Sequence, residues 1–494
     1  MTSPTLVDRV RAFLADAERM SSGTSDETAI RAIRARLSEP LRVAIAGRVK
    51  AGKSTLLNAM VGERIASTGV GECTRVLTWY RAAEACQVTL YPDHGPPEHV
   101  PFARNGSLQI DLAGYPVEEI RSLVVDWPSA HLRAMTLIDT PGLASLSAHL
   151  SARTSTLLSS GSNDGAEADA VIYLMRHLHA ADARALEAFQ DREIANPTAI
   201  NALGVLARAD EIGVARLDAM DSARRIAAHY SANPSIRRLC QTVVPVCGLL
   251  AEAAATLRES EYRSLAALAA MSEDQVTDLL VSVHHFARDK QALPVPASAR
   301  ITLLERLGMY GVRVCLEFLR RRSTATAGNL ADYLREQSGI LDLQALIRSQ
   351  FELRSDVLKA RSALSALALH LQGRSDNQSR TILGGLERVL GQSHEFQELR
   401  LYAALRAGWV QVTEDELAEL EVLLGTTGND LLPRLELPVD APATLVRDTI
   451  IRRVEYWQRR AENPLTTRQV VDAARIVIRS YEGLLVSCLV ATDS

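Results

Sequence analysis

The stretch VAIAGRVKAGKSTLL, residues 43–57, decides the fold of this chain of 494 residues. Four apolar residues lead into the pattern Gly47-x-x-x-x-Gly52-Lys53-Ser54, and a helix-forming run follows it. This strand–loop–helix context is typical of a P-loop, whose backbone N–H groups close around phosphate oxygens at a helix N-terminus. Lys53 is expected to reach the β- and γ-phosphates, and the Ser54 hydroxyl is expected to coordinate Mg²⁺. The nucleotide-binding residues predicted here are Gly47, Arg48, Val49, Lys50, Ala51, Gly52, Lys53, Ser54 and Thr55.

Lysine is unusually scarce in the chain, which makes a chance match to this pattern improbable. It occurs only at Lys50, Lys53, Lys290 and Lys359, whereas lysine and arginine together number 55. Two of the four lysines fall in the same loop. A glycine-rich turn without a ligand is therefore the weaker interpretation.

A second element stands about 85 residues further on, where TLIDTPG at residues 136–142 ends an apolar strand. An aspartate at the end of a strand beside a P-loop holds Mg²⁺ through water, and a following glycine amide can contact the γ-phosphate. Asp139 and Gly142 are the residues predicted for these roles. Ser54 and Asp139 thus form part of a predicted Mg²⁺ site.

The third element, GVLARAD at residues 204–210, is a strand followed by Arg-x-Asp. GTPases commonly carry Asn/Thr-Lys-x-Asp here, and the carboxylate accepts hydrogen bonds from guanine. Asp210 suits that role, and the stem of Arg208 can lie over the base, while Ala207 replaces the usual Asn or Thr. The next strand leads into Cys247-Gly248, placed for a backbone contact to the guanine O6. GTP is therefore the expected nucleotide, with ATP as the alternative.

A threonine that follows the γ-phosphate completes a GTPase site. Thr68 and Thr74 both lie between the P-loop and residue 139. Thr74 directly precedes an expected strand and is predicted as the second side-chain ligand to Mg²⁺ and as a catalytic residue; a solvated loop hydroxyl is the alternative for either threonine.

Composition excludes several other classes of protein. The net charge of −4 and the 4% aromatic content speak against a nucleic-acid-binding surface. The six cysteines show no zinc-binding spacing, and free thiols in a reducing cytosol are expected. The charged N-terminus does not resemble a signal peptide, and no apolar stretch reaches the ~20 residues of a membrane span. The chain is expected to be cytoplasmic, or peripheral at the inner face of the plasma membrane.

Short apolar runs alternate with helical patterns from residue 41 to about residue 247, which predicts an α/β sheet with helices on both faces. The segment 92–106, rich in proline and glycine, is expected to be a loop insertion. Expected strands cover residues 42–46, 75–81, 87–91, 122–126, 134–138, 170–175, 202–207 and 242–246.

The rest of the chain predicts helices. Amphipathic patterns cover residues 5–20 and 26–38 before the sheet, and no strand pattern occurs after Cys247. Capping boxes are expected at Ser272 with Gln275 and at Thr413 with Glu416. A single long helix is expected over 341–372, a hinge at residues 294–296, and a last helix from Asn463 to about residue 491. The predicted domains are 1–39 (N-terminal helices), 40–250 (α/β P-loop GTPase) and 251–494 (all-α neck and stalk).

The ordered motifs and the long helical half resemble the dynamin superfamily. Within it, the chain resembles bacterial dynamin-like proteins of the mycobacterial isoniazid-inducible protein C type. The likeness is carried by AGKSTLLNA at 51–59, ECTR at 72–75, ARADEIG at 207–213 and LERLGMYG at 304–311. It implies a GTPase head, a neck built partly from the N-terminal helices, a stalk, and heads that dimerise across the nucleotide. It also implies a link to membrane remodelling.

The resemblance further implies a positive charge near the β–γ bridge, which related large GTPases place at the third variable position of the P-loop. That position is Lys50, so Lys50 is a hypothetical catalytic residue together with Lys53; a solvated side chain is the alternative. The run Arg320-Arg321-Arg322 could touch lipid phosphates, although cations that complement a helix C-terminus are the simpler interpretation.

Three functions are compatible with this pattern. The leading one is a dynamin-like GTPase that self-associates, or pairs with a paralogous dynamin-like protein, through its heads at a lipid surface. The second is a GTP-switched scaffold with no membrane activity. A ribosome-assembly GTPase is third, because no basic RNA-binding domain is present.

Overall fold

This computed structural model describes residues 4–66, 76–104, 108–141, 168–176, 200–212, 216–237, 239–288, 293–322, 324–426, 428 and 430–492. Within these ranges a mixed sheet is followed by helices alone. The expected change from α/β to all-α at Cys247 is therefore confirmed for the part of the chain that the structure describes.

The central sheet contains nine strands within the described residues, in the order β11-β10-β9-β1-β8-β2-β7-β3-β4. Its parallel core joins β1 to β8 and β9, and continues through β10 to β11. Every residue of β9 and β10 is buried, as expected for parallel strands with both faces covered. The bounds are β1 (Leu41–Gly47), β2 (Thr78–Ala82), β3 (Gln87–Pro92), β4 (Glu98–His99), β7 (Ile120–Trp127), β8 (Met135–Asp139), β9 (Ala170–Met175), β10 (Ala202–Ala207) and β11 (Val243–Val246).

The stretch expected to be a loop insertion is partly ordered as strands. Within it lie β4 and β5 (Phe102–Arg104), and β5 pairs with β6 (Leu108–Ile110) in a separate antiparallel hairpin. The prediction missed these strands because they are only two or three residues long, and such short runs show no clear alternation of apolar and polar residues. The expectation of a loop over 92–106 was wrong for these residues.

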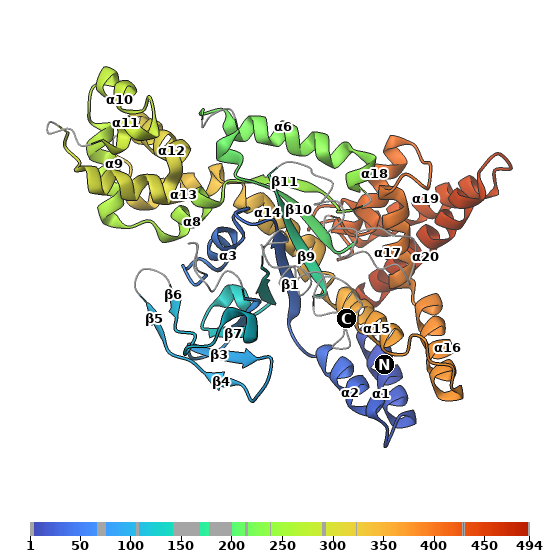
Figure 1. Ribbon diagram of the computed structural model, residues 1–494. Coiled ribbons are helices and arrows are strands. Elements are labelled where there is room, and N and C mark those ends of the chain that lie inside the picture. The colour runs from blue at the N-terminus through green and yellow to red at the C-terminus, as the bar shows by residue number, and fades with distance from the viewer. Residues whose placement is uncertain are drawn as a thin grey trace.

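Helices cover the two faces of the sheet. On one face, β-strand side chains share a core with α6 (Ala219–Ala232), α8 (Gly248–Thr256), α9 (Glu259–Ala269), α12 (Ala297–Arg321) and α13 (Ala327–Gln337). On the other face, they share a core with α3 (Lys53–Val61), α14 (Ile340–Ile347) and the start of α15 (Ser355–His370). Figure 1 shows α6 along one side of the sheet and the α8–α13 helices grouped beside it. Helices that follow Cys247 thus complete the core of the sheet.

Two further cores are entirely helical. In the first, α1 (Leu6–Met20) and α2 (Ser25–Arg36) pack with α15 and α16 (Asn377–Gln392). The second contains α17 (His394–Arg406), α18 (Glu414–Leu423), α19 (Ala443–Glu462) and α20 (Arg468–Thr492). The N-terminal helices therefore join helices more than 300 residues away. The shorter elements are α7 (Pro234–Arg237), α10 (Glu273–Leu279), α11 (Val283–Ala287), η2 (Val117–Glu119), η3 (Ala130–Leu132), η4 (Ala209–Glu211), η5 (Arg348–Glu352) and η6 (Pro433–Leu435).

The single helix expected over 341–372 was wrong. The chain forms α14, widens into the π-helical turn η5, and restarts as α15 after Arg354. Arg354 leaves helical geometry at the start of α15, and its guanidinium donates to the Leu424 carbonyl oxygen. The apolar pattern continues through the break, because α15 is buried on nearly all sides. A tertiary contact, which periodicity does not reveal, divides the helix.

Other details of the helical half follow the sequence more closely. Both expected capping boxes are present, at Ser272 with Gln275 and at Thr413 with Glu416. The last helix begins at Arg468, four residues after Pro464. The domain boundaries at residues 39 and 250 stay predictions.

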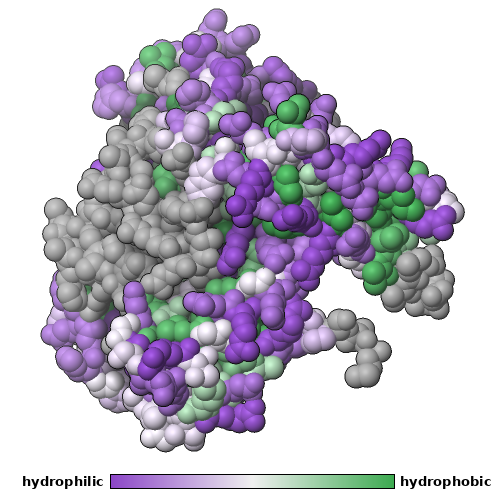
Figure 2. All heavy atoms as spheres, turned by 90° about the vertical axis from the view of Figure 1, so that its right-hand side faces the viewer, coloured by the Kyte–Doolittle hydropathy of each residue, from purple (hydrophilic) through white to green (hydrophobic). Residues whose placement is uncertain are grey.

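Figure 2 shows the side of the molecule that carries the C-terminal helices, where small hydrophobic groups lie among hydrophilic ones. In the described residues, no helix combines the length and the apolar character needed to span a bilayer. Large hydrophobic residues of this region with exposed side chains are Val439, Leu445, Ile451, Tyr456, Leu465 and Val486.

Candidate nucleotide-binding site

The P-loop turns from β1 into α3 through backbone conformations that favour glycine. Gly47 lies at the end of β1 with φ 152°, and a Cβ atom there would meet the Leu174 carbonyl oxygen at 2.5 Å. Gly52 has φ 97° and precedes the first residue of α3. Lys50 also adopts a left-handed conformation, with φ 62°, although it carries a side chain. Such strain in a non-glycine residue is common at functional sites.

Lys53, Ser54 and Asp139 meet at the carboxyl ends of β1 and β8. The Ser54 hydroxyl donates to Asp139 Oδ2 at 2.9 Å, while Lys53 Nζ lies 3.5 Å from the carbonyl oxygens of Gly47 and Arg48. Burial lowers the pKa of Lys53, and the charge of Asp139 opposes that shift. Burial likewise raises the pKa of Asp139, opposed by Lys53 and Ser54. Both charged groups are thus held out of water with incomplete compensation.

This cluster fits a hydrated Mg²⁺ ion. Among the residues that the structure describes, the buried Oδ1 atom of Asp139 has no hydrogen-bond partner, although buried polar atoms normally have one. Carboxylate and hydroxyl oxygens are the ligands that Mg²⁺ prefers, and the ion usually keeps several waters. Ser54 and Asp139 would hold such an ion, which would neutralise phosphate charge when bound. Thr74, the other predicted metal ligand, lies outside the described residues.

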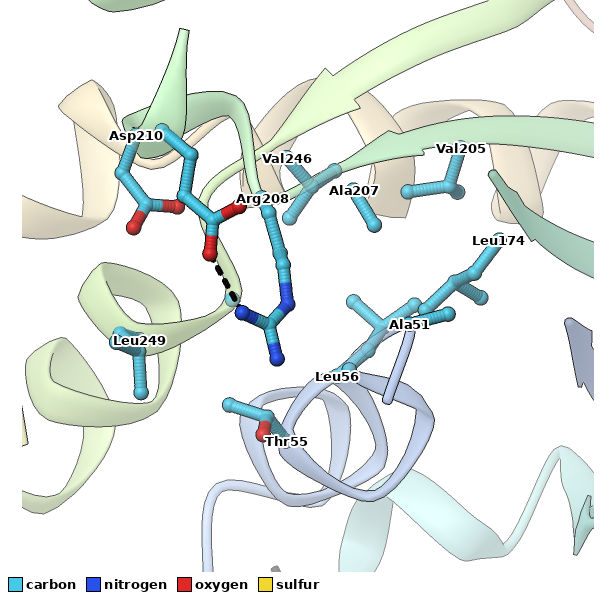
Figure 3. A pocket seen from close by; sticks show the side chains of 13 residues that line it. Ala51, Thr55, Leu56, Leu174, Val205, Ala207, Arg208, Asp210, Val246 and Leu249 are labelled. Atoms are coloured by element: carbon cyan, nitrogen blue, oxygen red, sulfur yellow. Dashed lines mark hydrogen bonds and ion pairs between the residues drawn. The ribbon is translucent and has the colours of Figure 1, made fainter. Parts of the chain in front are cut away.

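A cavity with about 540 Å³ of empty volume opens beside the P-loop. Figure 3 shows its apolar side chains converging from β9, β10, β11 and α3, with Asp210 at one end. An apolar slot that ends in a carboxylate suits a purine base with N–H donors on one edge. The apolar and small residues that line it are Ala51, Gly52, Leu56, Leu174, Val205, Ala207, Val246, Gly248 and Leu249.

Arg208 reaches across this cavity toward the start of α3 (Figure 3). Its backbone is left-handed, with φ 55°, and its guanidinium is ion-paired with Glu211. Glu211 also pairs with Arg176, at the end of β9. The pairing fixes the long side chain over the slot, where its stem can cover a bound base. Glu211 was not among the predicted site residues.

Asp210 lies at one end of the slot. Burial raises the pKa of its carboxyl group, and hydrogen bonds from its own backbone N–H and from the Cys247 thiol lower it. Cys247 is fully buried, whereas Gly248 lines the cavity. Gly248 therefore lies at the cavity, where its backbone can contact a base. Cys247 does not line the cavity, and its side chain contacts Asp210 instead.

Helix α12 touches the site from outside. It is kinked at Gly308, whose φ of 66° and ψ of 174° are not helical. A Cβ atom at this position would lie 3.7 Å from Asp210 Oδ2 and 3.5 Å from Leu249. The kink thus packs directly against the end of the base slot. A glycine inside a helical pattern was the only sequence signal for this contact.

The remaining predicted residues lie at the rim or outside the described ranges. Arg48, Val49 and Lys50 are exposed at the mouth of the P-loop, and Thr55 lines the cavity. Gly142 lies outside the described residues. The structure thus brings together nine predicted residues around one hollow and the adjoining charge cluster: Ala51, Gly52, Lys53, Ser54, Thr55, Asp139, Arg208, Asp210 and Gly248.

A buried polar network that the sequence did not indicate ties the P-loop helix to later helices. Asn58 on α3 accepts hydrogen bonds from the backbone N–H groups of Ile65 and Ala66, and donates to Glu252 on α8. Glu252 in turn pairs with Arg306 on α12. The network anchors the loop that follows α3.

This fold and site define a P-loop GTPase. Residues 42–203 match the family described as 50S ribosome-binding GTPase. At the level of the whole chain, the isoniazid-induced protein IniC of Mycobacterium tuberculosis strain H37Rv is 38% identical over 454 residues, which is 92% of this chain and 91% of the relative. The protein of strain CDC 1551 matches to the same extent. The chain belongs to the IniC family of dynamin-like GTPases.

Two solved structures of an oligomerised bacterial dynamin pair, described in terms of the long-range sensing and tethering of membranes, align with most of the chain. One is 13% identical, with a TM-score of 0.30, and covers 98% of this chain and 73% of the other. The second is 12% identical, with a TM-score of 0.32, and covers 97% and 79%. At such low TM-scores, nothing about this chain is inferred from the likeness.

Proposed function

We propose that this chain hydrolyses GTP with Mg²⁺ and uses the nucleotide cycle to control association of its heads at a membrane. The observation that carries the GTP site is the buried Oδ1 of Asp139 next to Ser54, which has no partner in the described part of the chain, beside an apolar slot that ends in Asp210. Lys53 binds the phosphates, and Ser54 and Asp139 hold the ion, with Thr74 as a further ligand. The Gly142 amide contacts the γ-phosphate, and Asp210 selects guanine.

The choice of base is tested by Asp210→Asn. An amide in place of the carboxylate loses acceptors for the guanine N–H groups but can donate to a base that carries a carbonyl instead, such as xanthine. The variant should bind xanthosine triphosphate better than GTP, while the wild type prefers GTP. Competition against a fluorescent nucleotide measures both affinities.

Asp221→Asn is the matched control, because Asp221 is exposed on α6 and, in the part of the chain that the structure describes, pairs only with Arg224. It should keep the wild-type preference. If Asp210→Asn still prefers GTP, or if ATP displaces GTP equally from the wild type, Asp210 does not read the base.

An exposed apolar residue at the mouth of the P-loop supports the association of two heads across the nucleotide. Val49 is 48% exposed there, between the exposed residues Arg48 and Lys50. An apolar side chain at the edge of a nucleotide site is suited to being covered by a second copy or by a paralogous dynamin-like protein. Lys50, in the same exposed turn, is proposed to supply positive charge to the bridge oxygen in cis.

The run Arg320-Arg321-Arg322, for which lipid contact was the less favoured interpretation, makes contacts within the chain. Arg320 donates to the carbonyl oxygens of Ala269 and Met271 near the end of α9, Arg321 pairs with Glu317, and Arg322 lies over the Phe318 ring. These contacts favour the structural interpretation of the run. They also keep a second candidate function open, a GTP-switched scaffold or partner subunit without membrane activity.

One experiment separates the two candidates. The full chain is mixed with liposomes of anionic lipid in GDP or in a non-hydrolysable GTP analogue, and co-sedimentation and self-association are measured together. Membrane coupling predicts sedimentation that depends on the GTP analogue. Association in solution with no sedimentation in either nucleotide would select the scaffold.

A further inference from the structure

A second hollow lies at the end of α3 that is farther from the P-loop. It has about 650 Å³ of empty volume and shares no lining residue with the nucleotide cavity. Leu56 lines the nucleotide cavity and Gly62 lines this hollow, so the two sites are separated by about 9 Å of helix. Its lining residues are Gly62, Glu63, Arg64, Arg104, Thr256, Arg258 and Arg306.

Arg306 is buried in the wall of the hollow, and each of its three guanidinium nitrogens donates to an acceptor. It bonds to Glu261 at 2.9 Å, to Glu252 at 3.3 Å and to the backbone and side-chain oxygens of Thr256 at 2.9 Å. Arg64 also pairs with Glu252, at 2.8 Å. These contacts make a fixed, charged wall whose geometry does not depend on a ligand.

Two other arginines stand at the rim of the hollow with donors to spare. Arg104 pairs with Glu63 and lies over the Trp127 ring at 4.5 Å, and its side chain remains 59% exposed. Arg258 is exposed at the start of α9, and within the described residues its guanidinium has no ion-pair partner. Because a guanidinium carries five N–H donors, both arginines can donate hydrogen bonds to a further anion.

The balance of charge favours an anion here. Four arginines line the hollow, whereas three carboxylates, Glu63, Glu252 and Glu261, pair with them. A concave surface with an excess of one sign of charge concentrates ligands of the opposite sign. Planar guanidinium groups bind phosphate through two parallel hydrogen bonds, which a lysine-lined site cannot do.

We propose that this hollow is a second anion site, separate from the GTP site, that binds a terminal phosphate group between Arg258 and Arg104. The same chemistry is offered by a free phosphorylated compound and by the headgroup of a phosphomonoester lipid. The test therefore uses both probes: pyrophosphate in solution, and vesicles of phosphatidylcholine with or without phosphatidate.

The protein is first saturated with GDP and Mg²⁺ so that the P-loop is filled. Calorimetric titration then measures pyrophosphate binding, and co-sedimentation measures vesicle binding. For whichever probe binds the wild type, Arg258→Gln should lower the affinity by about tenfold. The double variant Arg258→Gln with Arg104→Gln should abolish binding of that probe. Arg263→Gln is the matched control, since Arg263 is exposed on the same helix, pairs among the described residues only with Glu259, and does not line the hollow.

Binding of pyrophosphate that depends on Arg258 supports a soluble ligand. Binding only of phosphatidate vesicles, with the same dependence, supports a lipid headgroup. The proposal is overturned if neither probe binds the GDP-loaded wild type, or if Arg258→Gln binds as well as Arg263→Gln. Both variants remove exposed side chains, and unchanged unfolding temperatures would confirm that each is folded.

Discussion

Carboxylates that are largely removed from solvent occur in both the GTPase head and the C-terminal helices, but their surroundings differ. In the head, Asp139 has one bonded oxygen and one buried oxygen with no partner within the residue ranges described, and burial raises its pKa. Among the C-terminal helices, Glu419 accepts hydrogen bonds from Trp457 and Tyr481 and pairs with Arg453. Burial by itself would raise the pKa of Glu398, but His394, Arg434 and Ser480 bring it down to about 2.

This difference distinguishes carboxylates that bind a ligand from carboxylates that stabilise the fold. An enclosed carboxylate whose hydrogen bonds are complete holds helices together, because most of its partners come from other elements. A buried carboxylate with one oxygen that accepts no hydrogen bond lowers the stability of the fold unless a ligand binds that oxygen. A ligand is thus expected to stabilise the protein most at Asp139 in the head. The fully paired carboxylates of the C-terminal helices stabilise the fold without a ligand.

The largest expected effect is on nucleotide binding by Lys53→Ala. Loss of the buried cation should weaken binding of fluorescent GTP by about 100-fold or more, because the phosphate charge then lacks its closest countercharge. The nucleotide-free protein should lose about 1 kcal/mol or less, since the cation is poorly compensated in the folded state. Equilibrium titration and thermal unfolding measure the two quantities.

Lys359→Ala is the contrasting lysine variant. Lys359 donates to the carbonyl oxygens of Leu37 and Glu39 and pairs with Asp356. Its removal should lower stability and leave GTP affinity unchanged. If Lys53→Ala and Lys359→Ala changed GTP affinity to a similar extent, the distinction between the binding site in the head and the structural contacts elsewhere would be wrong.

The next largest effect is on stability, in Glu419→Ala. The change leaves the donors of the buried side chains Trp457 and Tyr481 without their acceptor and should cost about 2–4 kcal/mol. Chemical denaturation measures the loss, and GTP affinity should stay within about twofold. Glu455→Ala, at an exposed position of α19, should change stability by less than about 0.5 kcal/mol. Equal effects of these two changes would contradict the structural role of Glu419.

The smallest effect is on turnover, in Lys50→Ala. Removing a positive charge near the bridge oxygen should lower the rate of GTP hydrolysis per bound nucleotide by about tenfold or more, with little change in affinity. Arg48→Ala removes a neighbouring exposed cation of the same loop and should retain most of the rate. An unchanged rate in Lys50→Ala would leave Lys50 as a solvated side chain.

Motifs with fixed spacing predicted the head well. The P-loop, Asp139 and Asp210 follow buried parallel strands, and parallel strands bring their carboxyl ends to one edge, so these residues meet without further information. The apolar lining was harder to foresee, because Leu174 and Val205 look like ordinary core residues in the sequence. Arg208 was expected over the base, but its anchor Glu211 was not.

Periodicity predicted helices in the second half but not their breaks or contacts. The break at Arg354 depends on a carbonyl oxygen about 70 residues away, and the Asn58–Glu252–Arg306 network spans three helices. Side-chain pairs so distant in sequence leave no local pattern. Gly308 was visible as a glycine within a helix, yet its proximity to Asp210 needed the fold.

The scarcity of lysine gives the exposed Lys50 a practical value as a reporter. Of the three lysines that the structure describes, Lys53 and Lys359 are largely enclosed, and only Lys50 presents its amine at the surface. An amine-selective reagent read by peptide mass spectrometry would therefore modify the rim of the P-loop before the other two. The extent of labelling at this residue would then follow occupancy of the nucleotide site and covering of the rim by another head, without any engineered tag.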